Sequence, residues 1–446
     1  MRKNPPLAHV KRRLIPFGLA SLLFSGCGDQ STPCAGQSCS DGSGGSTSSG
    51  ATTGNPTGGS PAGNSGGTGN DEGSGGTSAT GGSAAETGGQ ASGGSSTETG
   101  GQSSGGMGTG GSDDEDSTCA LGVWDGSPPK ILQLSGSLGT HDPTVIEANG
   151  VFYRFDTGRN IPAFTSTNLT TWSATESVYS NANYPPSWLA AFRNDHNWKS
   201  GDNADPWAPD VEYFGGKYHL YSSNSLFFGK NISCISHLTK DDIASGTWQD
   251  QGTVVCTNGS ENFNAIDPEV ELDEDGTPWL IFGSFWSQAI QAIQLDQDGK
   301  RVGTDYHHLA HASSIEGPAL LRRCGYYYLF VTHGLCCPND TEAARHINNI
   351  DYRTVVGRSE NILGPYVDKS GKLLTAGGGT IMVEGKNTSG VDSPYAAAGH
   401  GDVFISGDKI YHAYHAYPYS RNPYAELRIV EMPFDEAGWP VAAEAP

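Results

Sequence analysis

The sequence predicts an all-β fold, a five-bladed β-propeller, preceded by a disordered linker rich in Gly and Ser. One pattern recurs five times from His141 onward: a short approach, a strand that begins at Val or Ala, a tight polar turn and an aromatic-rich strand. The copies lie roughly 65 residues apart, a spacing that accommodates a four-stranded propeller blade with its loops. Turn signals such as Asn149-Gly150 and Asp275-Gly276 separate the strands. Helical periodicity is scarce, and only residues 341–346 are expected to form a short helical turn.

The first segment, residues 1–27, is predicted to be an export signal. It has a basic start and then an apolar run from Leu14 to Phe24, followed by Ser25-Gly26-Cys27. This pattern is typical of a secretory signal, and the apolar run is too short to span a membrane. The small residues before Cys27 indicate a bacterial lipoprotein signal with Cys27 as the lipidation site; an ordinary cleaved signal is the alternative. We therefore expect an exported cell-surface or outer-membrane lipoprotein that meets the membrane only through its lipid anchor, or else a secreted protein.

The second segment, residues 28–118, is predicted to be a disordered linker. Between residues 41 and 111 it holds no Lys, Arg, aromatic or branched aliphatic residue. Such a segment cannot bury enough apolar surface to offset the entropy that it would lose on ordering. Residues 119–446 remain as the predicted propeller domain, which we expect to be a monomer. The net charge of −22 argues against a nucleic-acid partner, because nucleic-acid binding needs a basic face.

The nine cysteines suit an exported protein, because disulfides persist in oxidising compartments. Their spacing resembles no zinc-binding pattern. Cys34 with Cys39 could close a small loop, and Cys234 with Cys256 could join neighbouring strands, but the sequence settles neither pairing. The adjacent pair Cys336-Cys337 is open in the same way, as a vicinal disulfide or as two separate thiols.

A row of ionisable residues stands at one place of the repeat. The first apolar residues of the repeated strands are Val145, Val211, Val270, Ala319 and Val403. Three places before them stand Asp142, Ala208, Asp267, Glu316 and His400. A repeat accounts for the strands, but it does not account for three carboxylates and a histidine in register. Because the innermost strands of a propeller line its central channel, we expect these side chains to ring one mouth of that channel. Carboxylates gathered in this way perturb one another's pKa, which is typical of an active site.

Such a trio of carboxylates fits the hydrolysis of a glycosidic bond. One carboxylic acid protonates the leaving oxygen, and one carboxylate activates water or attacks the sugar. A third carboxylate can orient the acid and keep its pKa high. Aromatic residues at the mouth would stack on sugar rings, and Trp207, Phe285 and Trp286 lie at suitable strand ends. Core packing is the alternative for these three, and it is the expected role of Trp172 and Trp248 in two predicted outer strands.

An ordered set of short motifs runs from about His141 to the C-terminus. The motifs are Gly139–Pro143, Trp207–Val211, Asn264–Pro268, Gly283–Ser287, Ile315–Pro318, Leu335–Cys337, Val356–Ser359, Gly364–Tyr366, Gly399–Gly401 and Gly438–Pro440. Together they resemble glycoside hydrolase family 43, and within it the endo-α-1,5-L-arabinanases. The resemblance implies a five-bladed propeller and an inverting hydrolase that acts on arabinan, a side chain of plant cell-wall pectin.

The resemblance also implies a role for each residue of the site. Asp142 resembles the general base, Glu316 the general acid, and Asp267 the residue that tunes and orients that acid. An inverting enzyme keeps base and acid carboxyls about 6.5–9.5 Å apart, with room for a water between them. Asn264 and Ser284, with the three aromatic residues above, lie in the matching motifs as substrate-binding candidates. His400 resembles a channel histidine that helps to hold a cation, often calcium.

Three alternatives stay open. The nearest is an exo-acting arabinofuranosidase or β-xylosidase of the same family, because two segments depart from the arabinanase pattern. These are the polar loop of residues 338–351 and the insertion of residues 180–203, which contains Trp188 and Trp198. A lipoprotein that binds polysaccharide without cutting it is the second, although a pure binder has no use for three converging acids. A purely structural surface propeller is the third.

Overall fold

The computed structural model describes residues 117–199, 205–227, 230–284, 289–334, 352–385, 395–418 and 424–443. Several predictions fall outside these residues. They are the export signal with Cys27, the linker up to residue 116, Cys34 with Cys39, the turn at 341–346, and Cys336-Cys337. Within the part of the chain that the structure describes, no helix is long and apolar enough to cross a membrane.

Five sheets form the blades, which confirms the predicted all-β, five-bladed propeller. Blade 1 consists of β1 (Ser135–Gly136), β2 (Thr144–Ala148), β3 (Val151–Phe155), β4 (Ala163–Ser166) and β5 (Thr171–Thr175). Blade 2 consists of β6 (Trp207–Phe214), β7 (Lys217–Ser225), β8 (Ile232–Lys240) and β9 (Gln249–Asn258). Blade 3 consists of β10 (Glu269–Leu272), β11 (Pro278–Phe282), β12 (Ala289–Gln294) and β13 (His307–His311). Blade 4 consists of β14 (Ile315–Arg323), β15 (Tyr326–Gly334), β16 (Tyr352–Ser359) and β17 (Thr380–Glu384). Blade 5 consists of β18 (Tyr395–Ser406), β19 (Lys409–Pro418) and β20 (Glu426–Glu431).

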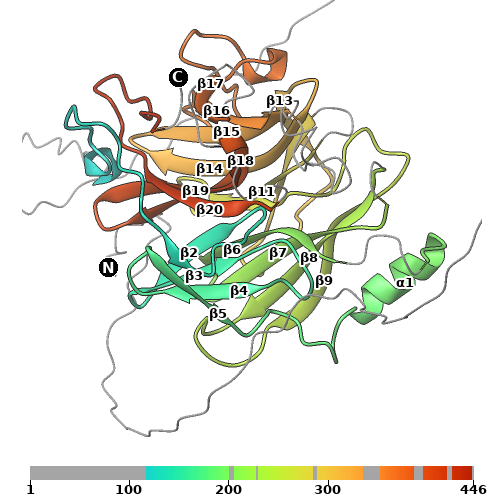
Figure 1. Ribbon diagram of the computed structural model, residues 1–446. Helices are drawn as coiled ribbons and strands as arrows, with labels where there is room; N and C mark the ends of the chain where they lie inside the picture. The colour runs from blue at the N-terminus through green and yellow to red at the C-terminus, as the bar shows by residue number, and fades with distance from the viewer. Residues whose placement is uncertain are drawn as a thin grey trace, which may run out of the picture. The chain divides into compact units, whose positions relative to one another are not determined.

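The blades follow one another in chain order around a ring, and Figure 1 shows this order by colour from teal in β2–β5 to red in β18–β20. Each innermost strand contacts its two neighbours, in the order β2, β6, β10, β14, β18 and back to β2. The ring closes where the chain before β1 pairs with β20. Leu132 donates a backbone hydrogen bond to Ile429 at 3.0 Å, and Glu431 donates one to Lys130 at 2.8 Å. The two ends of the domain thus share one blade, and β20 is not left as an open edge.

The predicted turn chemistry is confirmed at the hairpins. Between β2 and β3, Asn149 and Gly150 have φ of 53° and 75°, and between β6 and β7, Gly215 and Gly216 have φ of 57° and 88°. Positive φ at both central residues is what a tight type I′ hairpin requires, and Asn and Gly reach it at little cost.

An apolar core fills each space between neighbouring blades. Trp172 is 1% exposed in the core between blades 5 and 1, and Trp248 packs against the core between blades 1 and 2. The core-packing prediction for these two tryptophans is therefore confirmed. Removing a buried side chain of this size costs about 3–5 kcal/mol, so the cores hold the blades in fixed positions around the channel.

Two disulfides join described residues. Cys234 pairs with Cys256 across β8 and β9, as the sequence allowed. Cys119 pairs with Cys324, over a separation of 205 residues that no local pattern could reveal. The second bond ties the 3₁₀ turn at the start of the domain (Ser117–Ala120) to the β14–β15 turn.

One helix, α1 (Ser187–Asp195), lies in the insertion before blade 2. The expectation that helices are confined to residues 341–346 is therefore wrong. The helix starts after Pro186 and buries only Leu189 and Arg193, one turn apart. With Leu189 as the one buried apolar side chain, the helix produces no periodic signal in the sequence. Trp188, on this helix, donates its indole N–H to Asp250 at 3.1 Å, which fastens the insertion to β9.

Candidate active site

One backbone turn recurs at the start of each innermost strand and forms the mouth of the channel. In each copy one residue has a left-handed φ: Asp142 (50°), Ala208 (40°), Asp267 (56°), Gly317 (54°) and His400 (43°). Asp142 and Asp267 precede β2 and β10, whereas the other three lie within β6, β14 and β18, each at a register shift. This conformation is costly for residues other than glycine and, where it persists, gathers at functional sites. The recurring turn directs side chains from separate blades toward the same mouth.

The alignment of the fourth copy was wrong by one residue. Its left-handed position is Gly317, so Leu320 rather than Ala319 matches the first apolar residue of the other copies. Glu316 therefore stands one place earlier, beside a register shift in the pairing of β14 with β15 between Glu316 and Ala319. Its side chain is one methylene longer than that of aspartate, which compensates in part for the offset.

The innermost strands are tied together by carboxylates that accept backbone hydrogen bonds from another blade. The pairs, donor first, are Val145 with Asp402 at 2.8 Å, Val270 with Asp210 at 2.8 Å, and Leu320 with Glu269 at 2.9 Å. Leu320 makes the same bond as Val145 and Val270, which supports the corrected register. These bonds fix the strands against one another and therefore fix the turns that carry the site.

Asp142 is 7% exposed, and its carboxylate is held by residues of several strands. Its Oδ2 accepts a hydrogen bond from the Thr157 hydroxyl at 2.6 Å and lies 2.8 Å from His141 Nδ1. Its Oδ1 lies 2.9 Å from His400 Nδ1. Thr157 in turn accepts a hydrogen bond from the backbone N–H of Ala208 at 2.6 Å. Blade 2 has Ala208 at the repeated position and so contributes no ionisable side chain there. Its backbone nevertheless supports the carboxylate of Asp142 through Thr157.

The surroundings of Asp142 favour its ionised form. Burial alone would raise its pKa, but the positive charges of His141 and His400 outweigh burial and hold the pKa of Asp142 well below its usual value. A buried carboxylate that stays ionised can take a proton from a water molecule beside it, which is what a general base does.

Glu316 and Asp267 are buried, at 7% and 5% exposed. The Tyr352 hydroxyl donates a hydrogen bond to Glu316 Oε1 at 2.7 Å. Asp267 Oδ2 accepts a hydrogen bond from the backbone N–H of Gly317 at 3.2 Å, so Asp267 lies directly against the turn that carries Glu316. Its own N–H donates to Ser223 at 2.7 Å.

These surroundings favour the neutral form of Glu316. Burial, and after it the negative charge of Asp267, raise the pKa of Glu316 to about 8. Burial also raises the pKa of Asp267, to about 6, although the positive charge of His400 opposes the rise. Glu316 therefore keeps its proton at neutral pH, which a general acid requires. The Tyr352 hydroxyl occupies one oxygen of Glu316 and leaves the other for that proton.

His400 supplies positive charge to the mouth. Burial alone would lower its pKa, but the negative charges of Asp142 and Asp267 outweigh burial and raise the pKa of His400 to about 10. Its ring packs against Gly317, where an added Cβ would lie 2.5 Å from the ring. A glycine at 317 is therefore required both by the left-handed backbone and by the histidine.

His141, Asp142 and His415 form a group that could hold a metal ion, since their ligand atoms lie within 4.8 Å of one another. His400, the metal residue expected from the sequence, does not belong to this group, although its Nδ1 lies 2.9 Å from Asp142 Oδ1. His415 Nδ1 accepts the backbone N–H of Asp142 at 3.1 Å, while its Nε2 is buried with no hydrogen-bond partner among the described residues. Because Nδ1 accepts that bond, the neutral ring carries its proton on Nε2, which can donate to a water or another bound group, and His415 would ligate a metal directly only after losing the bond from Asp142. Two imidazoles and one carboxylate suit a transition metal, whereas calcium, which prefers oxygen, would need water for most of its ligands.

The expected substrate contacts are only partly within the described residues. Trp207 is the first residue of β6 and is half-buried. Asn264 is 7% exposed, and its Oδ1 has no hydrogen-bond partner in the described part of the chain, as a group reserved for a ligand would. Ser284 is buried just beyond the end of β11. Phe285 and Trp286 lie outside the described residues.

Sequence reasoning missed four residues that hold the trio: His141, Thr157, Tyr352 and His415. His141 could have been found, because it directly precedes Asp142 in the repeat. Thr157 and His415 could also have been found, because they share a repeated position with Ser223 and Thr332, and each of the four accepts a backbone N–H from the turn of the next blade. Tyr352, from β16, occupies no repeated position, and only the folded blade brings it to Glu316.

Comparison with known proteins gives consistent matches. The family model described as "Glycosyl hydrolases family 43" matches residues 136–440. The chain is 36% identical over 308 residues to the extracellular endo-alpha-(1->5)-L-arabinanase 1 of Bacillus subtilis (strain 168), a match that covers 67% of this chain and 86% of that protein. An exo-1,5-alpha-L-arabinanase from a bovine ruminal metagenomic library superposes with a TM-score of 0.60 at 34% identity, over 70% of this chain and 99% of that one. The Cellvibrio cellulosa alpha-L-arabinanase complexed with arabinohexaose superposes with a TM-score of 0.60 at 30% identity, over 68% of this chain and 94% of that one.

Proposed function

This chain belongs to glycosyl hydrolases family 43, and on that premise we propose that it is an inverting endo-α-1,5-L-arabinanase that cuts the arabinan of plant pectin. The observation that supports this most directly is the arrangement of Asp142, Asp267 and Glu316. Three blades bring these buried carboxylates to one mouth, and Tyr352 holds one oxygen of Glu316. The Bacillus subtilis relative, an extracellular endo-arabinanase, supports the choice of substrate and of endo action.

In this proposal Glu316 donates its proton to the leaving glycosidic oxygen, and Asp142 accepts a proton from the water that attacks the opposite face of the sugar. Asp267 keeps the pKa of Glu316 high until the proton moves, because its negative charge disfavours a second ionised carboxylate nearby. Thr157 and His400 hold Asp142 in the position from which it can reach the water. One proton leaves Glu316 and one arrives at Asp142, and exchange with solvent restores both residues.

An exo-acting enzyme is the second candidate. The ruminal exo-1,5-alpha-L-arabinanase is 34% identical to this chain, close to the 36% of the Bacillus subtilis endo-enzyme. The α1 insertion, which the structure fastens to β9 through Trp188, is a segment that could shorten a cleft. The pattern of products decides between the two candidates.

The test is to incubate the full chain with linear arabinan, and with arabinoxylan as a control, and to resolve the products by length. We expect a ladder of short arabino-oligosaccharides with inverted anomeric configuration. Glu316→Gln should lower kcat by about 10²–10⁴-fold, because a neutral amide cannot donate the proton. Glu274→Gln, an exposed glutamate on the β10–β11 turn, is the matched control and should leave the rate unchanged. Monosaccharide alone would establish the exo candidate, and binding without any product would refute hydrolysis.

For the cation, we propose that it lies at His141, Asp142 and His415 and is held largely through water, with calcium the ion implied by the resemblance. A bound cation would offset negative charge and order water in the channel. Metal analysis of the purified protein, repeated on His415→Ala, tests this. A stoichiometric metal that the variant loses supports the group, and a metal-free native protein that fails to bind added calcium or manganese contradicts it.

We also propose that the protein is exported, anchored through a lipid on Cys27, and monomeric. The two disulfides support an oxidising compartment. Metabolic labelling with a fatty acid should mark the native chain but not Cys27→Ala, and Cys27→Ala should appear in the soluble fraction. A native chain that takes up no label would leave only the secreted alternative.

A further inference from the structure

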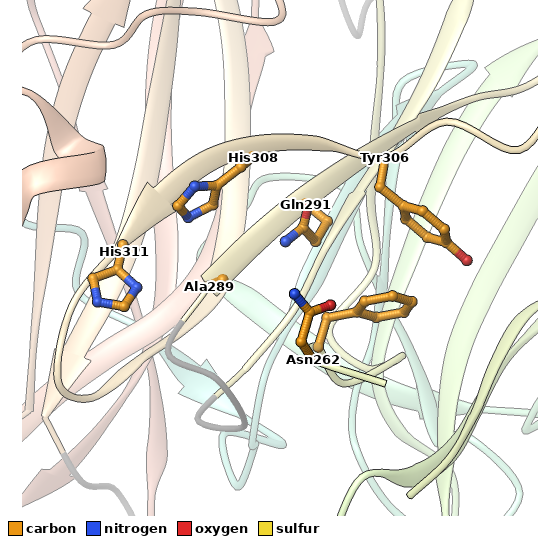
Figure 2. Close-up of a pocket in the computed structure, with 7 residues that line it drawn as sticks. Asn262, Ala289, Gln291, Tyr306, His308 and His311 are labelled. Carbon is orange, nitrogen blue, oxygen red and sulfur yellow. The ribbon is translucent and has the colours of Figure 1, made fainter. Parts of the chain in front are cut away.

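Blade 3 contains a hollow on its outer strands, in addition to the mouth of the central channel. It has a volume of about 370 Å³, within the range of small-ligand pockets. Figure 2 shows its lining from the segment before β10 and from β12 and β13, including Asn262, Gln291, Tyr306, His308 and His311. None of the three carboxylates Asp142, Asp267 and Glu316 lines this hollow, so it is separate from the group that would carry out the reaction.

Gln291 is the polar centre of this hollow. Its side chain is 8% exposed, and it makes no hydrogen bond with any described residue, while Figure 2 shows its amide directed into the hollow. The amide is open to the hollow and not sealed in the core, so it is available to bond water or a ligand there. A register shift in the pairing of β12 with β13 falls between Ile290 and Gln291. Shifts of this kind re-aim side chains, here toward the hollow.

One end of the hollow is an aromatic wall. The rings of Phe263 and Tyr306 lie 4.6 Å apart, tilted by 41°. Arg301 holds Tyr306 in place, because its guanidinium lies 4.2 Å from the ring centre and donates a hydrogen bond to the hydroxyl at 2.7 Å. Tyr306 is 39% exposed, so the wall is rigid but accessible.

The other end is polar and is formed by amide and imidazole side chains. His308 lies opposite Gln291 across β12 and β13, and the rings of His308 and His311 are perpendicular at 6.0 Å. Asn262 adds a second amide beside Gln291. The described lining residues include no Asp, Glu, Lys or Arg. Amides and imidazoles together with aromatic rings match a ligand that has many hydroxyl groups, an apolar ring face and no charge.

We propose that this hollow is a second carbohydrate-binding site, which holds a neutral polysaccharide chain away from the catalytic mouth. Gln291 anchors the sugar hydroxyls, and Tyr306 with Phe263 forms the wall for its ring. The choice of arabinan as the bound chain rests on the proposed function. One contact on blade 3 and one at the catalytic mouth would hold a polymer at two points, which raises its effective concentration at the mouth.

The test is electrophoresis of the full chain through gels that contain linear arabinan, in a Glu316→Gln background so that the polymer is not consumed. Gln291→Ala should weaken retardation by about fivefold, the effect of losing one good hydrogen bond. Tyr306→Ala, at a position exposed enough to tolerate the change, should weaken it similarly. Gln294→Ala, on the same strand but outside the hollow, is the matched control and should match the parent. Retardation that is equal in all four proteins would overturn the proposal.

The two proposals fail in different ways. If the native chain cuts arabinan but retardation does not depend on Gln291 or Tyr306, only the second site is refuted. If the native chain does not cut arabinan, the same gels are run with xylan and galactan. Retardation by either polymer that depends on Gln291 and Tyr306 would support a neutral-carbohydrate site without the proposed function, and its absence with every polymer would overturn the site.

Discussion

Replacing Tyr352 by Phe removes one hydroxyl from the site and leaves the buried ring in place. The hydroxyl donates a hydrogen bond to Glu316 Oε1 at 2.7 Å, and this bond opposes the rise in the pKa of Glu316 that burial and Asp267 cause. Losing it should therefore raise that pKa above about 8. A hydrogen bond to a charged group contributes about 1.5–3 kcal/mol and one to a neutral group about 1 kcal/mol, so the difference is about 0.5–2 kcal/mol. At 1.36 kcal/mol per unit, the expected shift is about 0.4–1.5 pKa units.

The assay is kcat/KM on linear arabinan as a function of pH, which reports the ionisations of the free enzyme. Glu316 acts in its protonated form, so activity is lost as the pH rises through its pKa. A higher pKa moves that alkaline limb to higher pH. At neutral pH, Tyr352→Phe should also lower the rate about 3–30-fold, because the acid is weaker and less well oriented. Tyr366→Phe removes a buried hydroxyl that bonds Ile362 elsewhere in blade 4, and it should leave the limb unmoved.

An alkaline limb that stays in place or moves to lower pH in Tyr352→Phe would refute the reasoning. The first result would mean that another group controls the limb. The second would mean that the hydroxyl stabilises the neutral form of Glu316 rather than the ionised form. An equal shift in Tyr366→Phe would show that the effect comes from general loosening of blade 4.

Three further predictions concern stability and the cation. Gly317→Ala should lower Tm by several degrees more than Gly325→Ala. Both glycines have positive φ, but only at Gly317 would an added Cβ lie 2.5 Å from the ring of His400. An equal loss of Tm in the two variants would contradict this contact. The buried imidazoles of His219 and His237 lie 2.9 Å apart, and burial lowers their pKa to about 4 and about 3, below the unfolded value of 6.5. At these two histidines the unfolded chain binds protons first, so they destabilise the fold as the pH drops from about 6.5 toward 4. The change in urea midpoint over this range should therefore differ between the native chain and His237→Phe, with the native chain losing more, and an equal change would refute this. Removal of bound metal with a chelator should lower Tm, with recovery on adding calcium, and an unchanged melting curve at a measured loss of metal would contradict a structural cation.

Several features follow from local sequence alone. Hairpin turns such as Asn149-Gly150 depend on the φ preference of their own residues, and the five copies repeat because each blade meets the same packing problem. Asp142, Asp267 and His400 were found for the same reason, since a repeated local turn places them. The tryptophans of the outer strands were also predicted correctly, because a large apolar residue in a strand is usually buried.

Predictions from local sequence failed where a feature depends on a contact with residues far away in the chain, or where the sequence signal is only a few residues long. Helix α1 buries only two side chains, and the Cys119–Cys324 pair joins residues 205 positions apart. The offset of Glu316 by one residue depends on a register shift against β15, which belongs to the strand pair and not to the sequence of one strand. Phe285 and Trp286, like the anchor and the linker, lie outside the described residues. The substrate contacts of Trp207, Asn264 and Ser284 also stay predictions.

By itself, the sequence determined the five-bladed fold, the three carboxylates and their place at one mouth, because each follows from a short pattern repeated along the chain. Only the tertiary structure decided how the carboxylates differ. Asp142 is held ionised by His141 and His400, whereas Glu316 is held neutral by burial and by Asp267. Those partners come from different blades, and the protonation of a buried group depends on the charges and solvent that the closed ring places around it.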